Sequence, residues 1–287
     1  MFILENRQLR LELLDPAADT AHQGWRYCWG GYIWQVHDRE LGPLLSGPEF
    51  PRPHPLAFNG QGLPESFRHR TRAGRPLTWR DGEGLAIGVG TITANPHPQA
   101  PAPESVLLGE PCHWEVAVFP TRLVCQTRQA AAGFSYELTR RIELDDRTVT
   151  SRSQLTNTGH TSLGLQWFAH PFWPLIAGSA RLQLPVGTVL LENPGFAVAA
   201  DGLLTFRHPF ESPEDSQFAL LTLPAGCLLS VSLNHPKLSR VTFATSFVPD
   251  ECPVWANQNT ISVEPYLHLD LAPGATRHWH VCHGFER

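Results

Sequence analysis

The segment 261–271 combines a strict alternation of apolar and polar residues with a carboxylate, Glu264. In an extended strand, alternate side chains point to opposite faces, so Glu264 shares one face with Ser262 and Tyr266. Pro265 cannot donate to a sheet ladder, and we expect the strand to be interrupted or edge-like beside Glu264. Such a polar face is often solvated, but on a concave sheet it lines a cleft where a carboxylate can act as a base.

His170 ends a second alternating run and is flanked by aromatic residues in the sequence W-F-A-H-P-F-W, residues 167–173. Aromatic side chains hold sugars by stacking on the ring, while a polar group handles the hydroxyls. His170 and Trp173 are therefore candidates for contact with a carbohydrate. The other interpretation is a core aromatic cluster around a hydrogen-bonded histidine.

Basic residues are concentrated between positions 68 and 80, where the chain carries Arg68, His69, Arg70, Arg72, Arg75 and Arg80. Arginine recognises phosphate with directional donors, so this run makes recognition of an anionic sugar one hypothesis. A solvated loop is the alternative.

A third cluster, His278, His280 and Cys282, would share one face of a strand and offers soft metal ligands. No partner Glu or His stands at the spacing of a metal site, so exposed strand residues are the favoured interpretation. We expect no metal and no organic cofactor.

Most of the chain alternates with the period of strands, as in residues 134–138, 163–167, 229–233 and 241–243. Its 23 glycines and 26 prolines interrupt any long helix. The pattern predicts a large, mainly antiparallel all-β sandwich, and we see no linker that would divide residues 1–287. Two irregular segments, about 42–84 and about 94–111, are expected to be loops, and the first is a candidate binding rim.

Composition excludes several classes of protein. Twenty-two basic and 27 acidic residues give a net charge of −5, which predicts no nucleic-acid partner. No apolar run reaches the roughly 18 residues of a membrane helix, and the first residues do not form a secretion signal. Six widely spaced cysteines indicate reduced, mostly buried thiols. We expect a cytoplasmic protein with no membrane contact. A nucleophile elbow, a phosphate loop and a zincin motif are missing from the sequence.

The order of these segments resembles that of the aldose 1-epimerase, or galactose mutarotase-like, proteins. The shared pattern is N-T-G at 157–159, F-A-H-P-F-W at 168–173, S-V-E-P-Y at 262–266 and A-P-G-A-T-R-H-W at 272–279. The resemblance is best from Tyr136 to the C-terminus. It implies that the fold is a β-supersandwich formed by residues 1–287 as a single domain.

The resemblance also implies a chemistry: His170 matches the family's general acid and Glu264 its general base. Together they would interconvert the α and β anomers of a hexose or related aldose by opening the ring, as an isomerase. The loop 59–68 is similar to one that brings an arginine to the sugar in hexose-6-phosphate mutarotases, which makes Arg68 and Glu65 candidate substrate contacts. The H-G-G motif of enzymes with assigned sugars is absent, so the sugar is not predicted. A non-catalytic carbohydrate-binding protein and a hexose-6-phosphate mutarotase are the alternatives.

Overall fold

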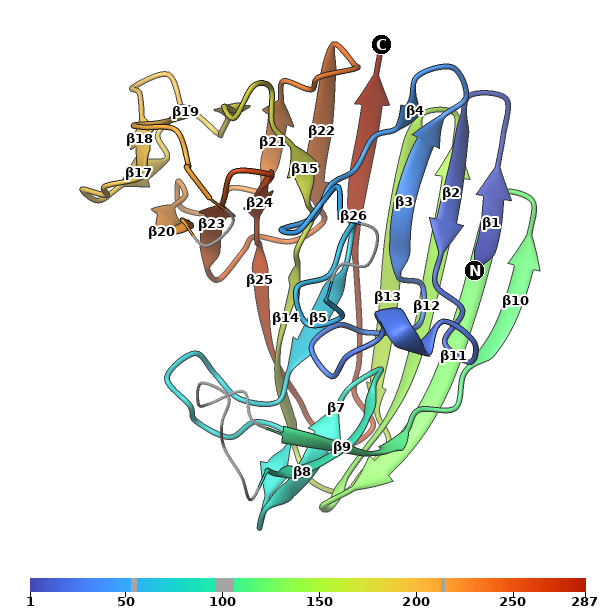
Figure 1. Ribbon diagram of the computed structural model, residues 1–287. Coiled ribbons are helices and arrows are strands. Elements are labelled where there is room, and N and C mark those ends of the chain that lie inside the picture. The colour runs from blue at the N-terminus through green and yellow to red at the C-terminus, as the bar shows by residue number, and fades with distance from the viewer. Residues whose placement is uncertain (53–55, 96–105, 213–214) are drawn as a thin grey trace.

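The computed structural model describes residues 1–52, 56–95, 106–212 and 215–287 (Figure 1). Within these ranges the strands pair antiparallel and form several sheets, and the one helical element is a short 3-10 turn, η1 (Thr20–His22). The predicted all-β, mainly antiparallel sandwich is confirmed. No helix among the described residues has the length and apolar character needed to cross a membrane.

The largest sheet in the described part of the chain contains ten strands. Its strands, in spatial order, are β10 (Glu115–Phe119), β11 (Arg122–Ala131), β12 (Phe134–Asp145), β13 (Thr148–Asn157), β26 (Thr276–Glu286), β22 (Arg240–Thr245), β21 (Ser230–Leu233), β16 (Arg181–Gln183), β19 (Leu203–Phe206) and β18 (Phe196–Val198). The alternation that predicted strands at 134–138, 229–233 and 241–243 produces β12, β21 and β22. Their apolar residues face the interior because every second side chain of a strand points the same way.

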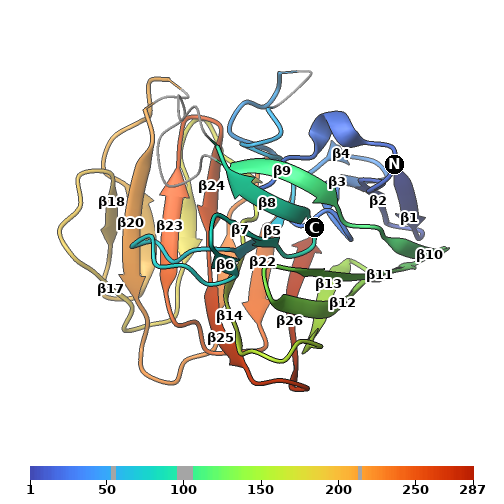
Figure 2. The same cartoon turned by 90° about the horizontal axis from the view of Figure 1, so that it is seen from below.

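Two further sheets lie at the amino-terminal side and the base of the sandwich. The first contains β1 (Phe2–Glu5), β2 (Leu9–Leu13), β3 (Ile33–Asp38) and β4 (Gly42–Pro43), and the second contains β6 (Trp79–Arg80), β7 (Glu83–Ala86), β8 (Gly90–Ala94) and β9 (Val106–Pro111). Figure 2 shows β1–β4 and β10–β13 on the opposite side of the molecule from β17, β20 and β23.

Two small sheets meet at the centre and carry the residues singled out above. The three-stranded sheet has the order β25 (Tyr266–Leu271), β14 (Leu163–Ala169), β5 (Glu65–Arg68). The five-stranded sheet has the order β15 (Trp173–Pro174), β24 (Thr260–Val263), β23 (Cys252–Ala256), β20 (Gln217–Thr222), β17 (Val189–Leu190). The strand predicted over 261–271 is therefore two strands, interrupted at Glu264 and Pro265 as expected.

The two segments predicted to be irregular contain strands, which corrects that part of the sequence analysis. β4, β5, β6 and the start of β7 fall within 42–84, and β9 falls within 94–111. Each is short or paired only with distant residues, so local alternation could not reveal it. Residues 96–105 of the second segment lie outside the described residues.

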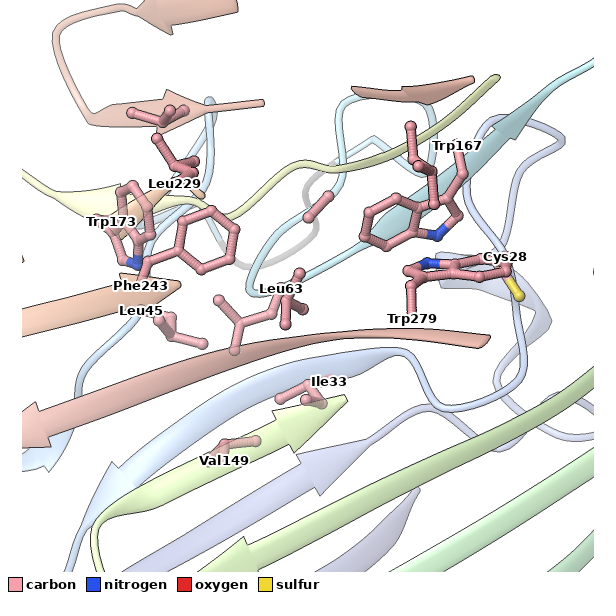
Figure 3. Close-up of a cluster of buried hydrophobic side chains, with 14 of the residues drawn as sticks. Cys28, Ile33, Leu45, Leu63, Val149, Trp167, Trp173, Leu229, Phe243 and Trp279 are labelled. Atoms are coloured by element: carbon pink, nitrogen blue, oxygen red, sulfur yellow. The ribbon is translucent and has the colours of Figure 1, made fainter. Parts of the chain in front are cut away.

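One continuous apolar core joins all five of these sheets. Large aromatic residues fill its centre: Trp167 meets Trp279 edge to face at 5.6 Å between ring centroids, and Trp173 meets Phe243 at 5.5 Å (Figure 3). All six cysteines are free and four of them are buried, which matches the prediction. The core fixes the two small sheets against the large one and so supports the residues between them.

Candidate functional site

The two predicted catalytic residues lie where the chain passes between the two small sheets. His170 follows β14 of the three-stranded sheet and precedes β15 of the five-stranded one, and Glu264 lies between β24 and β25 in the opposite sense. Pro171 and Pro265 follow them, and a residue before proline is restricted to extended conformations. The backbone N–H of His170 donates to Pro64 O at 2.9 Å, and that of Glu264 donates to Pro253 O at 2.8 Å. Both residues are thus held by sheet-like backbone bonds.

At this junction the imidazole and the carboxyl group meet. His170 Nε2 lies 3.3 Å from Glu264 Oε1, and His170 Nδ1 lies 3.0 Å from the hydroxyl of Ser262. Both His170 and Glu264 are buried, at 3% and 6% exposure. Nearly a hundred positions apart in the sequence, the two side chains come into contact and form one acid–base pair.

Burial moves the pKa values of this pair in opposite directions. It raises the pKa of Glu264 to about 7, against the lowering effect of the positive charges of Arg26, Arg72 and Arg68. It holds the pKa of His170 well below its ordinary value, and the charge of Arg26 adds to that effect. Both changes disfavour the charged forms, so near neutral pH the proton of the pair resides mainly on the carboxyl group.

A cavity of about 470 Å³ opens in front of the pair. Its aromatic wall consists of Trp25, Phe67, Phe168, Phe172, Phe218, Trp255 and Tyr266. Phe168 and Tyr266 stack in parallel at 4.5 Å, and the ring of Phe172 lies 4.4 Å from that of His170. The volume falls in the range of small-molecule sites, and aromatic walls with a few polar groups suit a sugar ring.

Arg68 also lines this cavity, at the end of β5. Its Nε donates to Arg70 O at 3.1 Å, and its guanidinium also contacts the hydroxyl of Tyr266. The structure therefore brings together three of the five residues predicted from the sequence: His170, Glu264 and Arg68.

The other two predicted substrate contacts, Glu65 and Trp173, lie outside the cavity wall, and these two predictions are corrected. Glu65 points from β5 into the sandwich, where it pairs with Arg140 and accepts hydrogen bonds from Ser151 (2.5 Å) and Trp167 Nε1 (3.1 Å). Trp173 is only 1% exposed and packs in the core. Alternation explains Glu65: it faces the opposite side of β5 from Ser66 and Arg68.

Sequence reasoning missed several cavity residues, among them Arg26, Trp255 and Asn257. Arg26 lies in an irregular, aromatic-rich stretch before β3, where no period indicates which side chains face inward. Trp255 is the one residue of β23 that is not fully buried, and a tryptophan at such a position often contacts a ligand.

The proposed soft-ligand cluster lies on the outer face of β26, away from the core. His278, His280 and Cys282 are exposed or partly exposed, whereas the intervening Trp279 and Val281 are buried. Thr150 of the neighbouring β13 lies 3.6 Å from the Cys282 thiol. In the part of the chain that the structure describes, no group of three or more His, Cys, Asp or Glu residues could hold a metal ion.

Solved structures share this architecture at low sequence identity. A galactose mutarotase related enzyme from Lactobacillus acidophilus is 13% identical, covering all of this chain and 97% of its own, with a TM-score of 0.64. A galactose mutarotase-like protein from Lactobacillus casei is 13% identical over the whole of both chains, with a TM-score of 0.62. One from Clostridium acetobutylicum is 12% identical, covering 99% of this chain and 94% of its own, with a TM-score of 0.59.

This chain has the galactose mutarotase-like fold. Neither a family profile nor a curated protein matches its sequence. The galactose mutarotase-like fold thus accounts for the architecture, and the chemistry must be argued from the cavity itself.

Proposed function

We propose that this protein is a mutarotase-like isomerase that interconverts the α and β anomers of an aldose by general acid–base ring opening. The observation that carries this proposal is the buried contact between His170 and Glu264 at the wall of a sugar-sized cavity. The aromatic wall supplies stacking surfaces for the ring, and the pair supplies both a proton donor and a proton acceptor.

Ring opening moves two protons in a balanced way. Glu264, as carboxylate, takes the proton of the anomeric hydroxyl, whose electron pair forms the C1=O1 double bond. The bond between C1 and the ring oxygen breaks, and protonated His170 gives its proton to that oxygen. The pair then holds a carboxylic acid and a neutral imidazole.

Ring closure reverses these transfers after rotation about the C1–C2 bond. The neutral imidazole takes the proton back from the ring oxygen, and the carboxylic acid returns its proton to O1. The pair carries one proton throughout the cycle. The resting pair holds its proton mainly on Glu264, because burial disfavours the doubly charged form. Transfer of that proton to His170 across the 3.3 Å contact gives the carboxylate and the imidazolium with which ring opening begins.

Ser262 is a positioning residue in this scheme. Its hydroxyl lies at hydrogen-bond distance from His170 Nδ1 and directs the other ring nitrogen, Nε2, toward the carboxyl group and the substrate.

Anomer exchange measured by NMR tests the proposal. The pure α anomer of a candidate aldose is mixed with protein, and exchange above the buffer rate is expected for the native chain. Glu264→Gln keeps the size of the side chain but cannot accept the proton, and it should return exchange to the buffer rate. Unchanged exchange in Glu264→Gln would remove Glu264 from the mechanism. Saturable sugar binding by the native chain without exchange would instead identify a carbohydrate-binding protein.

A further inference from the structure

We propose that the sugar accepted by this cavity carries an anionic group, a phosphate ester or a carboxylate, bound by the arginines of the cavity wall. This inference rests on the proposed function for the position of the sugar ring. Three observations support it: the charge of the cavity wall, the contacts that hold its arginines, and the position of Arg75 outside that wall.

The described cavity wall is strongly positive in an otherwise acidic protein. Five arginines line it, Arg26, Arg52, Arg68, Arg70 and Arg72, together with only two carboxylates, Glu49 and Glu264. Five against two gives a formal charge of +3, whereas the whole chain carries −5.

The two carboxyl groups of the described wall both contact other residues. Glu49 accepts hydrogen bonds from Asn59 Nδ2 at 3.0 Å and from the backbone N–H of Leu56. The second carboxyl group, Glu264, is engaged with His170. The net positive charge of the described wall would attract an anionic ligand more strongly than a neutral sugar.

Two of the arginines, both in the loop after β5, stack on aromatic rings. The guanidinium of Arg70 lies 4.4 Å from the ring centroid of Trp79, and that of Arg72 lies 4.6 Å from that of Phe218. Arg72 also contacts Glu251 at 3.3 Å. Stacking on a ring fixes the plane of a guanidinium. Arg72 Nη1 already donates to Glu251, so an anion would be bound by the other N–H groups of Arg72 and by the terminal N–H groups of Arg70.

Arg70 also contains a buried donor that lacks an acceptor. Its Nε is shielded from solvent, and no hydrogen-bond partner for it occurs among the described residues. Because solvent does not reach Nε, an anion in the cavity would be bound by the terminal nitrogens of Arg70 instead.

The same loop provides a matched control. A tight turn, in which Thr71 N donates to Arg75 O at 2.9 Å and Arg75 N donates to Thr71 Oγ1 at 3.0 Å, reverses the chain after Arg72. Arg75 is exposed and does not belong to the cavity wall. Substitution of Arg75 therefore removes a charge from the loop without removing one from the cavity wall, whereas substitution of Arg70 or Arg72 removes one from the wall.

Calorimetric titration of the native chain with glucose, glucose 6-phosphate and glucuronate tests the inference. We expect at least one of the two anionic sugars to bind about tenfold or more tightly than glucose, the effect of one charge-assisted hydrogen bond. Tighter binding of glucose 6-phosphate identifies a phosphate ester, and tighter binding of glucuronate identifies a carboxylate. Equal affinity for all three sugars would overturn the inference.

Variants then assign the preference to the arginines. In Arg70→Gln with Arg72→Gln, the ratio of anionic to neutral affinity should fall about tenfold or more, while in Arg75→Gln it should stay at the native value. A native ratio in the double variant would refute the assignment. Failure of the proposed function is distinguishable, because Glu264→Gln would then exchange anomers at the native rate whatever the binding preference.

Discussion

Replacing Glu264 by Gln should stabilise the folded protein at alkaline pH even as it removes catalysis. Burial raises the pKa of this carboxyl group to about 7, from an ordinary value of 4.5. The folded chain therefore binds this proton more tightly than the unfolded chain. Its contribution to stability is complete below about pH 4.5 and is lost as pH rises to about 7. The difference corresponds to on the order of 3 kcal/mol.

Urea unfolding followed by tryptophan fluorescence measures the effect. Native protein and Glu264→Gln are compared at about pH 5 and about pH 8, where the buried carboxyl is mainly protonated and mainly ionised. The variant should gain about 2–3 kcal/mol over the native protein between these two values. Taking the difference in unfolding free energy between the two pH values removes any effect of the Gln side chain that does not depend on pH. Glu115→Gln, an exposed glutamate of β10, serves as a control for the loss of one surface charge.

A specific result would refute this reasoning. If the native protein and Glu264→Gln lose stability in parallel between the two pH values, the carboxyl group titrates alike in the folded and unfolded chain. The burial argument would then be wrong, and with it the assignment of a proton to this group at neutral pH.

Further predictions concern catalysis and the core. In the proposed mechanism His170 and Glu264 together hold one proton, so kcat/KM for anomer exchange should decline above about pH 7 in a pH–rate measurement, and a rise through that region would contradict the scheme. Ser262→Ala should reduce kcat/KM about tenfold and displace the pH profile, since His170 loses the partner of Nδ1; an unmoved profile would make Ser262 merely structural. Glu65→Ala should cost about 3–5 kcal/mol in urea unfolding, because it strands Arg140 in the interior, and adding Arg140→Met should recover part of that loss. Trp173→Ala should cost about 3–5 kcal/mol while leaving the affinity for sugar at the native value.

Much of the fold could be predicted from the sequence, because a long strand that is buried on one side alternates apolar and polar residues along its length. Residues 134–145 are an example: Leu138 and Ile142 face the core and become β12. Short strands such as β5 carry no such period. Their pairing depends on residues a hundred positions away, as in the register of Phe67 with Trp167.

The buried ion pair shows where sequence reasoning about the site went wrong. Glu65 was assigned to substrate through a loop resemblance, although the alternation of residues 134–145 indicates a buried arginine that needs a carboxylate partner. Arg140 is two residues from Leu138 and two from Ile142, so it shares their inner face of β12, where a charge requires a buried carboxylate. Predicting the pair would have required knowing that β5 lies opposite β12, which only the tertiary fold determines.

The position of His170 and Glu264 between two sheets has a mechanical consequence. Each residue is attached through its own strand to one sheet and through the next strand to the other, so a small change in the angle between the sheets alters the gap between the imidazole and the carboxyl group. Substitutions among the interior side chains that set this angle, far from any sugar, should tune turnover. If the proposed activity holds, directed evolution of faster anomer exchange would then select changes beneath the cavity floor as readily as changes in its wall.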